Sequence, residues 1–301
     1  MKENLAALLT EQRNPRTAQL DRVSTEEMLR LINQEDQTVA LAVEAAIPQI
    51  AVALELIVAS LKAGGRLFYT GAGTSGRLGV LDASECPPTF NVSPELVQGF
   101  IAGGDRALRY AVEGAEDSPE RGASELRAMG FRAGDVLCGI AASGRTPYVK
   151  GALLEARELG GKRIALACTP AALISSYADV AIEVLTGPEV LTGSTRLKAG
   201  TATKLVLNML STGAMVKLGY TYGNLMVNLQ PTNEKLVDRA QRIVAAATGI
   251  GVDEAEILLR EAGMLVRTAI VMGRLKIDRS AAEALLAQAG NRVAEALGEA
   301  S

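Results

Sequence analysis

The sequence contains no histidine and no tryptophan, and these absences remove several classes of function at once. Without histidine there is no Ser-His-Asp triad, no Cys-His pair, no histidine-bearing zinc site and no histidine general base. Aromatic residues are limited to six Tyr and four Phe, which argues against the stacking platforms that bind single-stranded nucleic acid. Proton chemistry near neutral pH therefore depends on carboxylates, Lys, Tyr or Cys.

Cysteine, net charge and long apolar runs are also scarce. Cys86, Cys138 and Cys168 are widely spaced and form no CxxC motif, which fits a reducing cytoplasm and predicts neither a disulfide framework nor a metal site. Lys and Arg number 31 against 34 Asp and Glu, so a basic nucleic-acid footprint is not expected. The N-terminus lacks the apolar core of a signal peptide, and charged residues interrupt the run Val43–Leu61. We expect no cofactor and no membrane or nucleic-acid partner.

Five short apolar runs, mostly separated by helical patterns, organise the first two thirds of the chain. Near-continuous apolar strands that alternate with helices are typical of a parallel sheet covered on both faces. Before them, a capping box of Ser24 and Glu27 begins a helix over 25–33, and a second helix over 38–62 ends at Gly64. The expected strands are 66–70, 97–102, 136–141, 163–167 and 180–185, and the intervening helices are 76–85, 118–129, 147–159 and 171–177.

The predicted fold is an α/β three-layer αβα sandwich with a five-stranded parallel sheet, followed by a small helical domain. A long helix extends from about Thr195 to Leu218, and no strand pattern follows about residue 235. We therefore expect a domain over 1–235 and a C-terminal helical domain over 236–301. Ligands of such sheets bind at the carboxyl ends of the strands.

Glycine-rich turns follow two of these strands. The run Gly71–Arg77 joins the first strand to a helix, where backbone N–H groups and hydroxyls form a cradle for an anion. It matches GxGxxG, but Gly103 and Gly104 follow the second strand where a dinucleotide site needs an acid. A second loop, Ala141–Pro147, repeats the Ser-Gly-Arg pattern after the third strand. Structural turns are the alternative, but two adjacent cradles favour a phosphate site.

A third polar cluster, 193–198, begins the long helix and adds further hydroxyls and cations. The residues predicted to bind the substrate or its phosphate are Gly73, Thr74, Ser75, Gly76, Arg77, Ser143, Gly144, Arg145, Thr146, Ser194 and Lys198.

Carboxylates are the candidate acids and bases. Pro87 and Pro88 predict that a helix ends just after Glu85, where the helix dipole raises the pKa of a carboxyl, as a general acid requires. A second acidic group, Glu113 and Glu116 with their neighbour Asp117, lies after the second strand. The alternative for this group is a solvated acidic turn.

Several motifs in matching order resemble the N-acetylmuramic acid 6-phosphate etherase family of the sugar isomerase (SIS) domain superfamily. The resemblance spans nearly the whole chain, with two conservative departures. Asn91 stands where the family has Gly, and the segment 194–197 reads Ser-Thr-Arg-Leu where Ser-Ser-Arg-Met is more usual. The matching segments are Gly71–Gly79, Asp82–Phe90, Ala111–Asp117, Ala141–Tyr148, Lys198–Thr201 and Thr232–Leu236.

The resemblance implies a carbon–oxygen lyase that cleaves the ether between D-lactate and carbon 3 of the sugar, giving N-acetylglucosamine 6-phosphate and D-lactate. Two glutamates do this chemistry in the family, and they correspond to Glu85 and Glu116. We expect Glu85 to protonate the departing lactate and Glu116 to act on the carbon-2 proton or the water, although the roles could be exchanged. The resemblance also implies a homodimer that works in the recycling or catabolism of cell-wall amino sugars.

The remaining predictions concern binding. Thr74, Ser75, Ser143 and Thr146 are candidates for the phosphate. The lactyl carboxylate needs a cation of its own, for which Lys198 is the candidate, supported by Arg145 or Arg77.

Two other functions would use the same loops. A sugar-phosphate isomerase would deprotonate the same carbon but needs no leaving group, and the lack of histidine for ring opening counts against it. A non-catalytic sugar-phosphate sensor would need the loops without the two acids. The presence of Glu85 and Glu116 in their motif settings favours the lyase.

Overall fold

The computed structural model describes residues 9–231 and 233–299, which form two compact units. The first unit comprises the chain as far as Ser84 together with Pro94–Gly213. The second comprises Glu85–Ser93 and the chain from Ala214 onward. The division therefore falls earlier in the chain than the expected boundary at 235–236, and a short stretch from the middle of the chain joins the second unit.

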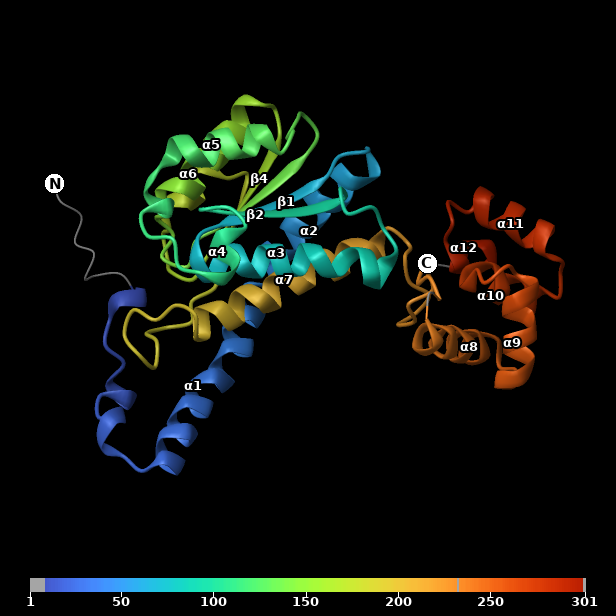
Figure 1. The fold of residues 1–301 in the computed structure, drawn as a ribbon, viewed down its shortest axis with the longest axis horizontal. Helices are drawn as coiled ribbons and strands as arrows, with labels where there is room; N and C mark the ends of the chain where they lie inside the picture. Colours follow the sequence, from blue (N-terminus) through green and yellow to red (C-terminus); the bar gives the residue numbers. More distant parts are fainter. Residues whose placement is uncertain (1–8, 232, 300–301) are drawn as a thin grey trace. The chain divides into compact units, whose positions relative to one another are not determined.

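The first unit contains one sheet of five parallel strands in the order β2-β1-β3-β4-β5 (Figure 1). Strands β1 and β3 are buried along their whole length, as expected when both faces are covered. The predicted five-stranded parallel sheet is therefore confirmed. The strands are β1 (Leu67–Gly71), β2 (Val97–Ile101), β3 (Val136–Ile140), β4 (Lys162–Ala167) and β5 (Val180–Glu183).

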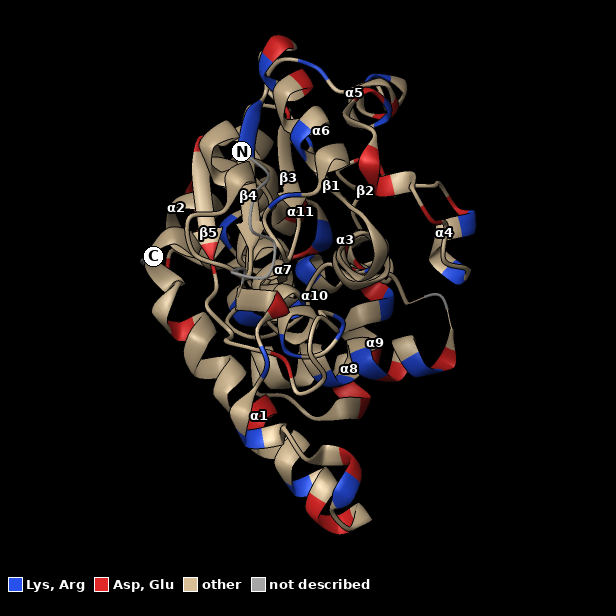
Figure 2. Ribbon diagram, turned by 90° about the vertical axis from the view of Figure 1, so that its left-hand side faces the viewer, with Lys and Arg blue, Asp and Glu red and all other residues tan. Residues whose placement is uncertain are grey.

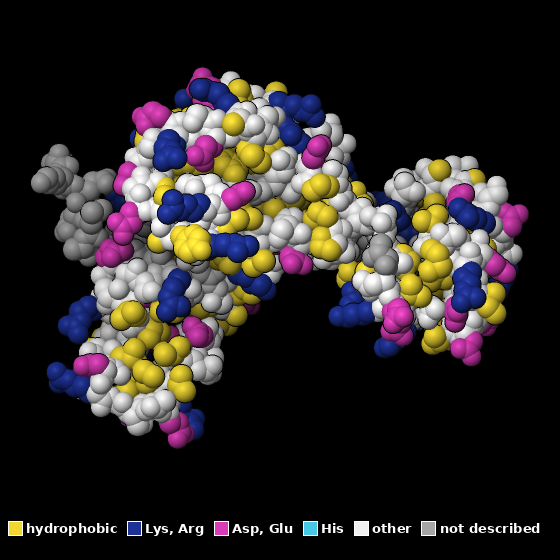
Figure 3. All heavy atoms as spheres, in the orientation of Figure 1, with side chains coloured by type: hydrophobic (Ala, Val, Ile, Leu, Met, Phe, Trp, Pro, Cys, Tyr) yellow, Lys and Arg dark blue, Asp and Glu magenta, His cyan; other side chains and the backbone are white. Residues whose placement is uncertain are grey.

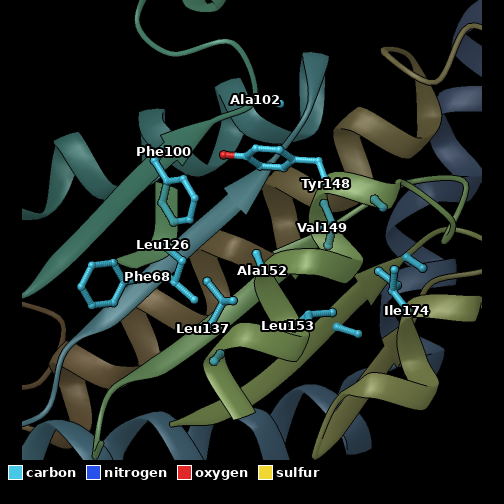
Figure 4. Close-up of a cluster of buried hydrophobic side chains, with 14 of the residues drawn as sticks. Phe68, Phe100, Ala102, Leu126, Leu137, Tyr148, Val149, Ala152, Leu153 and Ile174 are labelled. Carbon is cyan, nitrogen blue, oxygen red and sulfur yellow. The ribbon is translucent and has the colours of Figure 1, made fainter. Parts of the chain in front are cut away.

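Helix α6 (Pro147–Glu158) packs on one face of the sheet, and α5 (Pro119–Ala128) packs on α6. The two helices touch through backbone, since a Cβ on Gly151 would lie 1.9 Å from the carbonyl oxygen of Pro119. Beneath them lies an apolar core that includes Phe68 and Tyr148 (Figure 4). This core packs the helices against β1 and β3, which pair in register along their whole length.

The opposite face carries α2 (Ile47–Lys62), α3 (Gly73–Phe90) and α7 (Lys198–Lys217), which completes the three layers (Figure 1). Tyr69 points to this face because side chains alternate along a strand, and a Cβ on Gly79 of α3 would lie 2.9 Å from the Tyr69 Cβ atom.

A buried carboxylate links α3 to α7. Asp82 accepts hydrogen bonds from Asn208 Nδ2 at 2.7 Å and from Ser211 Oγ at 3.1 Å. Burial raises the pKa of Asp82, although these two bonds and one from Tyr69 act in the opposite direction. Asp82 therefore fixes the middle of α3 against the long helix.

Helix α1 (Thr25–Ala45) differs from the prediction. The sequence predicts separate helices over 25–33 and 38–62, whereas α1 is continuous and the break comes at Ala46, two residues before Pro48. The helix begins as expected, because Ser24 Oγ accepts a hydrogen bond from the Glu27 N–H at 3.2 Å. The polar stretch 33–38 is therefore part of a helix, which buries Glu35 and exposes most of the neighbouring polar side chains.

Short helices complete the first unit. The expected helix over 171–177 is only a short 3-10 helix, and a one-turn helix follows β2 where none was predicted. These elements are η2 (Leu9–Glu11), η3 (Pro15–Thr17), η4 (Leu20–Arg22), α4 (Arg106–Arg109), η5 (Ala115–Asp117) and η6 (Leu173–Tyr177).

The second unit contains the predicted C-terminal helices. They pack around their own apolar core, which includes Val244, Leu259 and Ile270. Asn233 caps the first of them by accepting a hydrogen bond from the Leu236 N–H at 3.0 Å. The helices are α8 (Glu234–Thr248), α9 (Val252–Glu261), α10 (Val266–Leu275), α11 (Arg279–Gln288) and α12 (Val293–Ala296).

Charges of both signs are interspersed along the helices, for example on α1 and α9, while β1, β2 and β3 carry none (Figure 2). Among the described residues, no single helix has the length and hydropathy of a membrane span. Helices α1 and α2 have that length and hydropathy only when they are taken together, and a bend of 59° separates them.

Candidate active site

The first predicted cradle lies between β1 and α3. Gly73 has a φ of +53°, and a Cβ on Gly76 would lie 2.6 Å from the carbonyl oxygen of Gly71. The loop therefore folds back so closely that only glycine fits, and the helix begins immediately at Gly73. Thr74 and Ser75 lie in this first turn and are half-buried. Backbone N–H groups at such a helix start have no partner within the helix and suit an anion.

The second predicted cradle lies between β3 and α6. Gly144 has a φ of +70°, and a Cβ there would lie 2.4 Å from the Ala172 Cβ atom. Ser143 and Thr146 are half-buried, and the Thr146 side chain does not cap α6. Strands β1 and β3 pair so that Gly71 lies opposite Ile140. The two loops therefore begin side by side at one edge of the sheet, as the sequence predicts.

The acidic turn follows β2, the other neighbour of β1. Ala115 is buried in the core beside Phe100 and Tyr148, whereas Glu116 is exposed. The turn depends on Gly114, which has a φ of +70°. The buried alanine fixes the backbone and directs the next side chain outward.

A cavity of about 240 Å³ joins the first cradle to the acidic turn. Gly73 and Arg77 line it from the cradle, and Glu113, Gly114 and Glu116 line it from the turn. The structure thus brings a carboxylate and an anion-binding loop into one cavity. Larger hollows exist, such as one of about 630 Å³ among the helices α9–α11, but none of the predicted site residues lines that hollow.

The Arg77 side chain also has a structural contact. Its Nε donates to the carbonyl oxygen of Leu108 at 3.1 Å, which ties α3 to α4. The second cradle, with Ser143 and Arg145, does not line the cavity of the acidic turn.

Glu85 is exposed on α3, but the helix end that the sequence predicts just after it is wrong. Helix α3 does not stop after Glu85; it continues through Pro87 and Pro88 to Phe90. Glu85 therefore lies more than one turn from the helix C-terminus, where the effect of the dipole has faded.

The departure at Asn91 has a simple geometric basis. Asn91 follows the last residue of α3 and has a φ of +50°. Glycine is the usual residue in this left-handed conformation, and Asn is one of the few others that tolerate it. The replacement of Gly by Asn therefore preserves the helix end.

The start of α7 differs from the third predicted cradle. Glu189 is 1% exposed, and its carboxylate already accepts hydrogen bonds from the N–H groups of Lys198 and Ala199, both at 2.9 Å. Burial raises the pKa of Glu189, although these N–H groups act against the rise. Ser194 lies in the preceding turn and is half-buried. A carboxylate of the chain itself therefore occupies the position in which an anion was expected.

The prediction that Lys198 binds the lactyl carboxylate needs the same correction. Lys198 is 1% exposed, and its Nζ lies 2.7 Å from Glu35 Oε2. Arg16 contacts the other oxygen of Glu35 at 2.6 Å. Burial tends to raise the pKa of Glu35, but the bonds from Lys198 and Asn14 and the charge of Arg16 outweigh it and lower the pKa. The ammonium therefore serves a buried ion pair.

Glu35 was not singled out from the sequence, although a signal exists. It lies on the same face of α1 as Val39 and Val43, at spacings of four residues, and all three are buried. A carboxylate on an apolar helix face requires a cationic partner. The sequence does not reveal that the partner is Lys198.

Among the described residues, no group of three or more His, Cys, Asp or Glu is arranged to hold a metal ion. The three cysteines are buried and form no disulfide, and burial raises the pKa of both Cys138 and Cys168 to about 12. These thiols are therefore protonated at neutral pH.

Comparison with known proteins places the chain in a family. Residues 49–157 match the Glucokinase regulatory protein N-terminal SIS domain, and residues 121–213 match the SIS domain. A phosphoheptose isomerase from Neisseria gonorrhoeae has the same fold, with a TM-score of 0.50, 21% identity, and coverage of 64% of this chain and 100% of that chain.

Much closer relatives cover nearly the whole chain. An N-acetylmuramic acid 6-phosphate etherase from Mycolicibacterium smegmatis is 55% identical over 98% of this chain and 99% of its own length. Another, from Glaesserella parasuis, is 54% identical over 97% of this chain and 96% of its own length. The chain belongs to the N-acetylmuramic acid 6-phosphate etherase family.

Proposed function

We propose that this chain cleaves the lactyl ether of N-acetylmuramic acid 6-phosphate, giving N-acetylglucosamine 6-phosphate and D-lactate. The observation that carries the proposal is the cavity of about 240 Å³ that Gly73 and Arg77 share with Glu116. It offers donors for a phosphate and a carboxylate for proton transfer, and the near full-length relatives are etherases of this substrate.

Elimination is the route that suits these groups. An alkoxide is a poor leaving group, so direct hydrolysis of an alkyl ether is difficult. In the open-chain sugar, the aldehyde at carbon 1 acidifies the proton on carbon 2, and the lactyl oxygen on carbon 3 lies β to it. A base takes that proton, an acid protonates the departing oxygen, and water then adds at carbon 3.

We assign the base to Glu116 and the acid to Glu85. Both side chains are exposed and able to reach a substrate. Each positioned acid or base contributes about 10²–10⁴-fold in rate. Thr74, Ser75, Ser143 and Thr146 are the proposed phosphate contacts, in loops that start next to one another at the sheet edge.

We also propose a homodimer that works in the cytoplasm. Hydrophobic side chains gather on the part of the first unit formed by α1 and the N-terminal turns (Figure 3). Leu29 and Leu41 of α1 are 57% and 66% exposed, which suits a surface covered by a second copy. Buried cysteines that form no disulfide are usual in proteins of a reducing compartment.

One assay separates the three candidate functions. With N-acetylmuramic acid 6-phosphate, the lyase releases D-lactate and N-acetylglucosamine 6-phosphate in equal amounts. An isomerase would interconvert an aldose and a ketose without lactate, and a sensor would bind the sugar without turnover. Either of those results, from folded protein, would overturn the proposal.

A further inference from the structure

The last residues of α3 include two prolines. Pro87 and Pro88 have no N–H, so the carbonyl groups of Ala83 and Ser84 cannot receive the usual helical hydrogen bonds. These bonds are lost at the point where Glu85 begins the stretch that belongs to the second unit. The helix therefore has two fewer hydrogen bonds of its own to hold the segment that carries Glu85, and contacts from outside the helix gain importance.

Asn228 provides this support within the second unit. Its Nδ2 donates a hydrogen bond to the carbonyl oxygen of Phe90, the last residue of α3. Asn228 is 9% exposed and precedes α8, so it reaches Phe90 across 138 residues of sequence. The contact satisfies one of the carbonyl groups that every helix leaves unpaired at its C-terminus.

Arg267 of α10 fixes the other end of the same amide. Its Nη2 donates a hydrogen bond to Asn228 Oδ1, and its Nη1 donates to the carbonyl oxygen of Asn291 at 2.8 Å. Both polar atoms of the Asn228 amide are therefore engaged, so the amide has one orientation.

Arg267 is a charged residue on a helix whose neighbouring side chains are mostly buried. Its neighbours Val266 and Thr268 are 2% and 3% exposed, and burial lowers the pKa of Arg267, against a smaller opposite effect of Tyr220. An apolar residue would pack at this position without the cost of desolvating a charge. The guanidinium instead donates hydrogen bonds to the Asn228 side chain and to the Asn291 carbonyl oxygen.

We propose that the C-terminal helical unit positions Glu85: Arg267 orients Asn228, and Asn228 holds the end of the helix that carries Glu85. Phe90 lies five residues after Glu85, about 7.5 Å along a helix. Asn228 and Arg267 are positioning residues, and the proposal rests on the catalytic role proposed for Glu85.

The decisive variant is Asn228→Asp. A carboxylate still accepts from Arg267, so the helical unit keeps its fold, but it has no N–H for the carbonyl oxygen of Phe90. We expect kcat for D-lactate release to fall about 10- to 100-fold, as for a small displacement of a catalytic group, with KM nearly unchanged. Asn228→Ala should give a similar loss of kcat.

A matched control comes from the same unit. Asp278 caps α11 by accepting from the Ala281 N–H at 2.8 Å, so Asp278→Ala destabilises the helical unit without touching α3. It should lower the unfolding temperature and leave kcat unchanged. Equal kcat values for Asn228→Asp and Asp278→Ala would overturn the positioning role.

A double variant separates this proposal from the role of Glu85. If Asn228 acts through Glu85, adding Asn228→Asp to Glu85→Gln causes no further loss of kcat. A further 10-fold loss would show that Asn228 acts by another route and would overturn the positioning role alone. Full activity of Glu85→Gln by itself would overturn the catalytic role of Glu85, and the positioning role with it.

Discussion

Replacing Glu116 by Gln lowers the rate of D-lactate release by about 10²–10⁴-fold, because the amide cannot accept the proton from carbon 2. Glu85→Gln gives a loss of similar size, since the departing lactate is then expelled without a proton. The rate is measured as lactate released per enzyme at saturating substrate. Glu120→Gln, an exposed glutamate four residues from Glu116, is the control and should retain the full rate.

The response of the two variants to a better leaving group shows which glutamate is the acid and which is the base. An analogue with a good leaving group at carbon 3, such as a nitrophenoxide, needs no protonation to depart. It should restore the rate of Glu85→Gln and leave Glu116→Gln slow. Restoration of Glu116→Gln instead would exchange the roles, and full lactate release by either variant would remove that glutamate from the mechanism.

Lys198→Met lowers the free energy of unfolding by about 3 kcal/mol at neutral pH, because Glu35 is left as a buried carboxylate with only one cation. Denaturant unfolding measures this change. Arg16 is 63% exposed and continues to contact Glu35, so the effect lies at the lower end for a broken buried pair. Replacing both partners, as Lys198→Met with Glu35→Leu, should recover most of the stability.

The ion pair of Lys198 and Glu35 also makes the stability of the fold depend on pH. The pKa of Glu35 lies below its ordinary value of 4.5 in the folded chain, so its ionised form contributes stability above that value and loses it as pH falls through the folded pKa. The difference in stability between wild type and Lys198→Met should therefore shrink below about pH 4.5. A difference that stays constant as the pH falls well below 4.5 would contradict the ion-pair account.

The sheet and its loops were predictable because their signals are local. Each strand is a short, nearly continuous apolar run, and each cradle needs glycines where backbone atoms approach closely, as at Gly76 and Gly144. The break between α1 and α2 was less predictable. A run of polar helix formers around Glu35 resembles a linker in sequence, and the real break depends on Ala46 and Pro48.

The parts of the site that sequence did not predict depend on partners far along the chain. Lys198 and Glu35 are separated by 163 residues, and Asn228 and Phe90 by 138. In sequence, Lys198 has the features of a ligand, and only its burial beside Glu35 in the structure shows its partner. Pro87 and Pro88 predicted a helix end, but packing of the following residues in the second unit carries α3 to Phe90.

The central claim is that two carboxylates transfer protons in an elimination followed by addition of water. The most direct test is turnover of N-acetylmuramic acid 6-phosphate in D₂O enriched in ¹⁸O, with the products analysed by mass spectrometry. The account predicts deuterium on carbon 2 and ¹⁸O on carbon 3 of the N-acetylglucosamine 6-phosphate, with no ¹⁸O at carbon 2 of the lactate. An ¹⁸O label at carbon 3 without deuterium at carbon 2, or a label in the lactate hydroxyl, would contradict it.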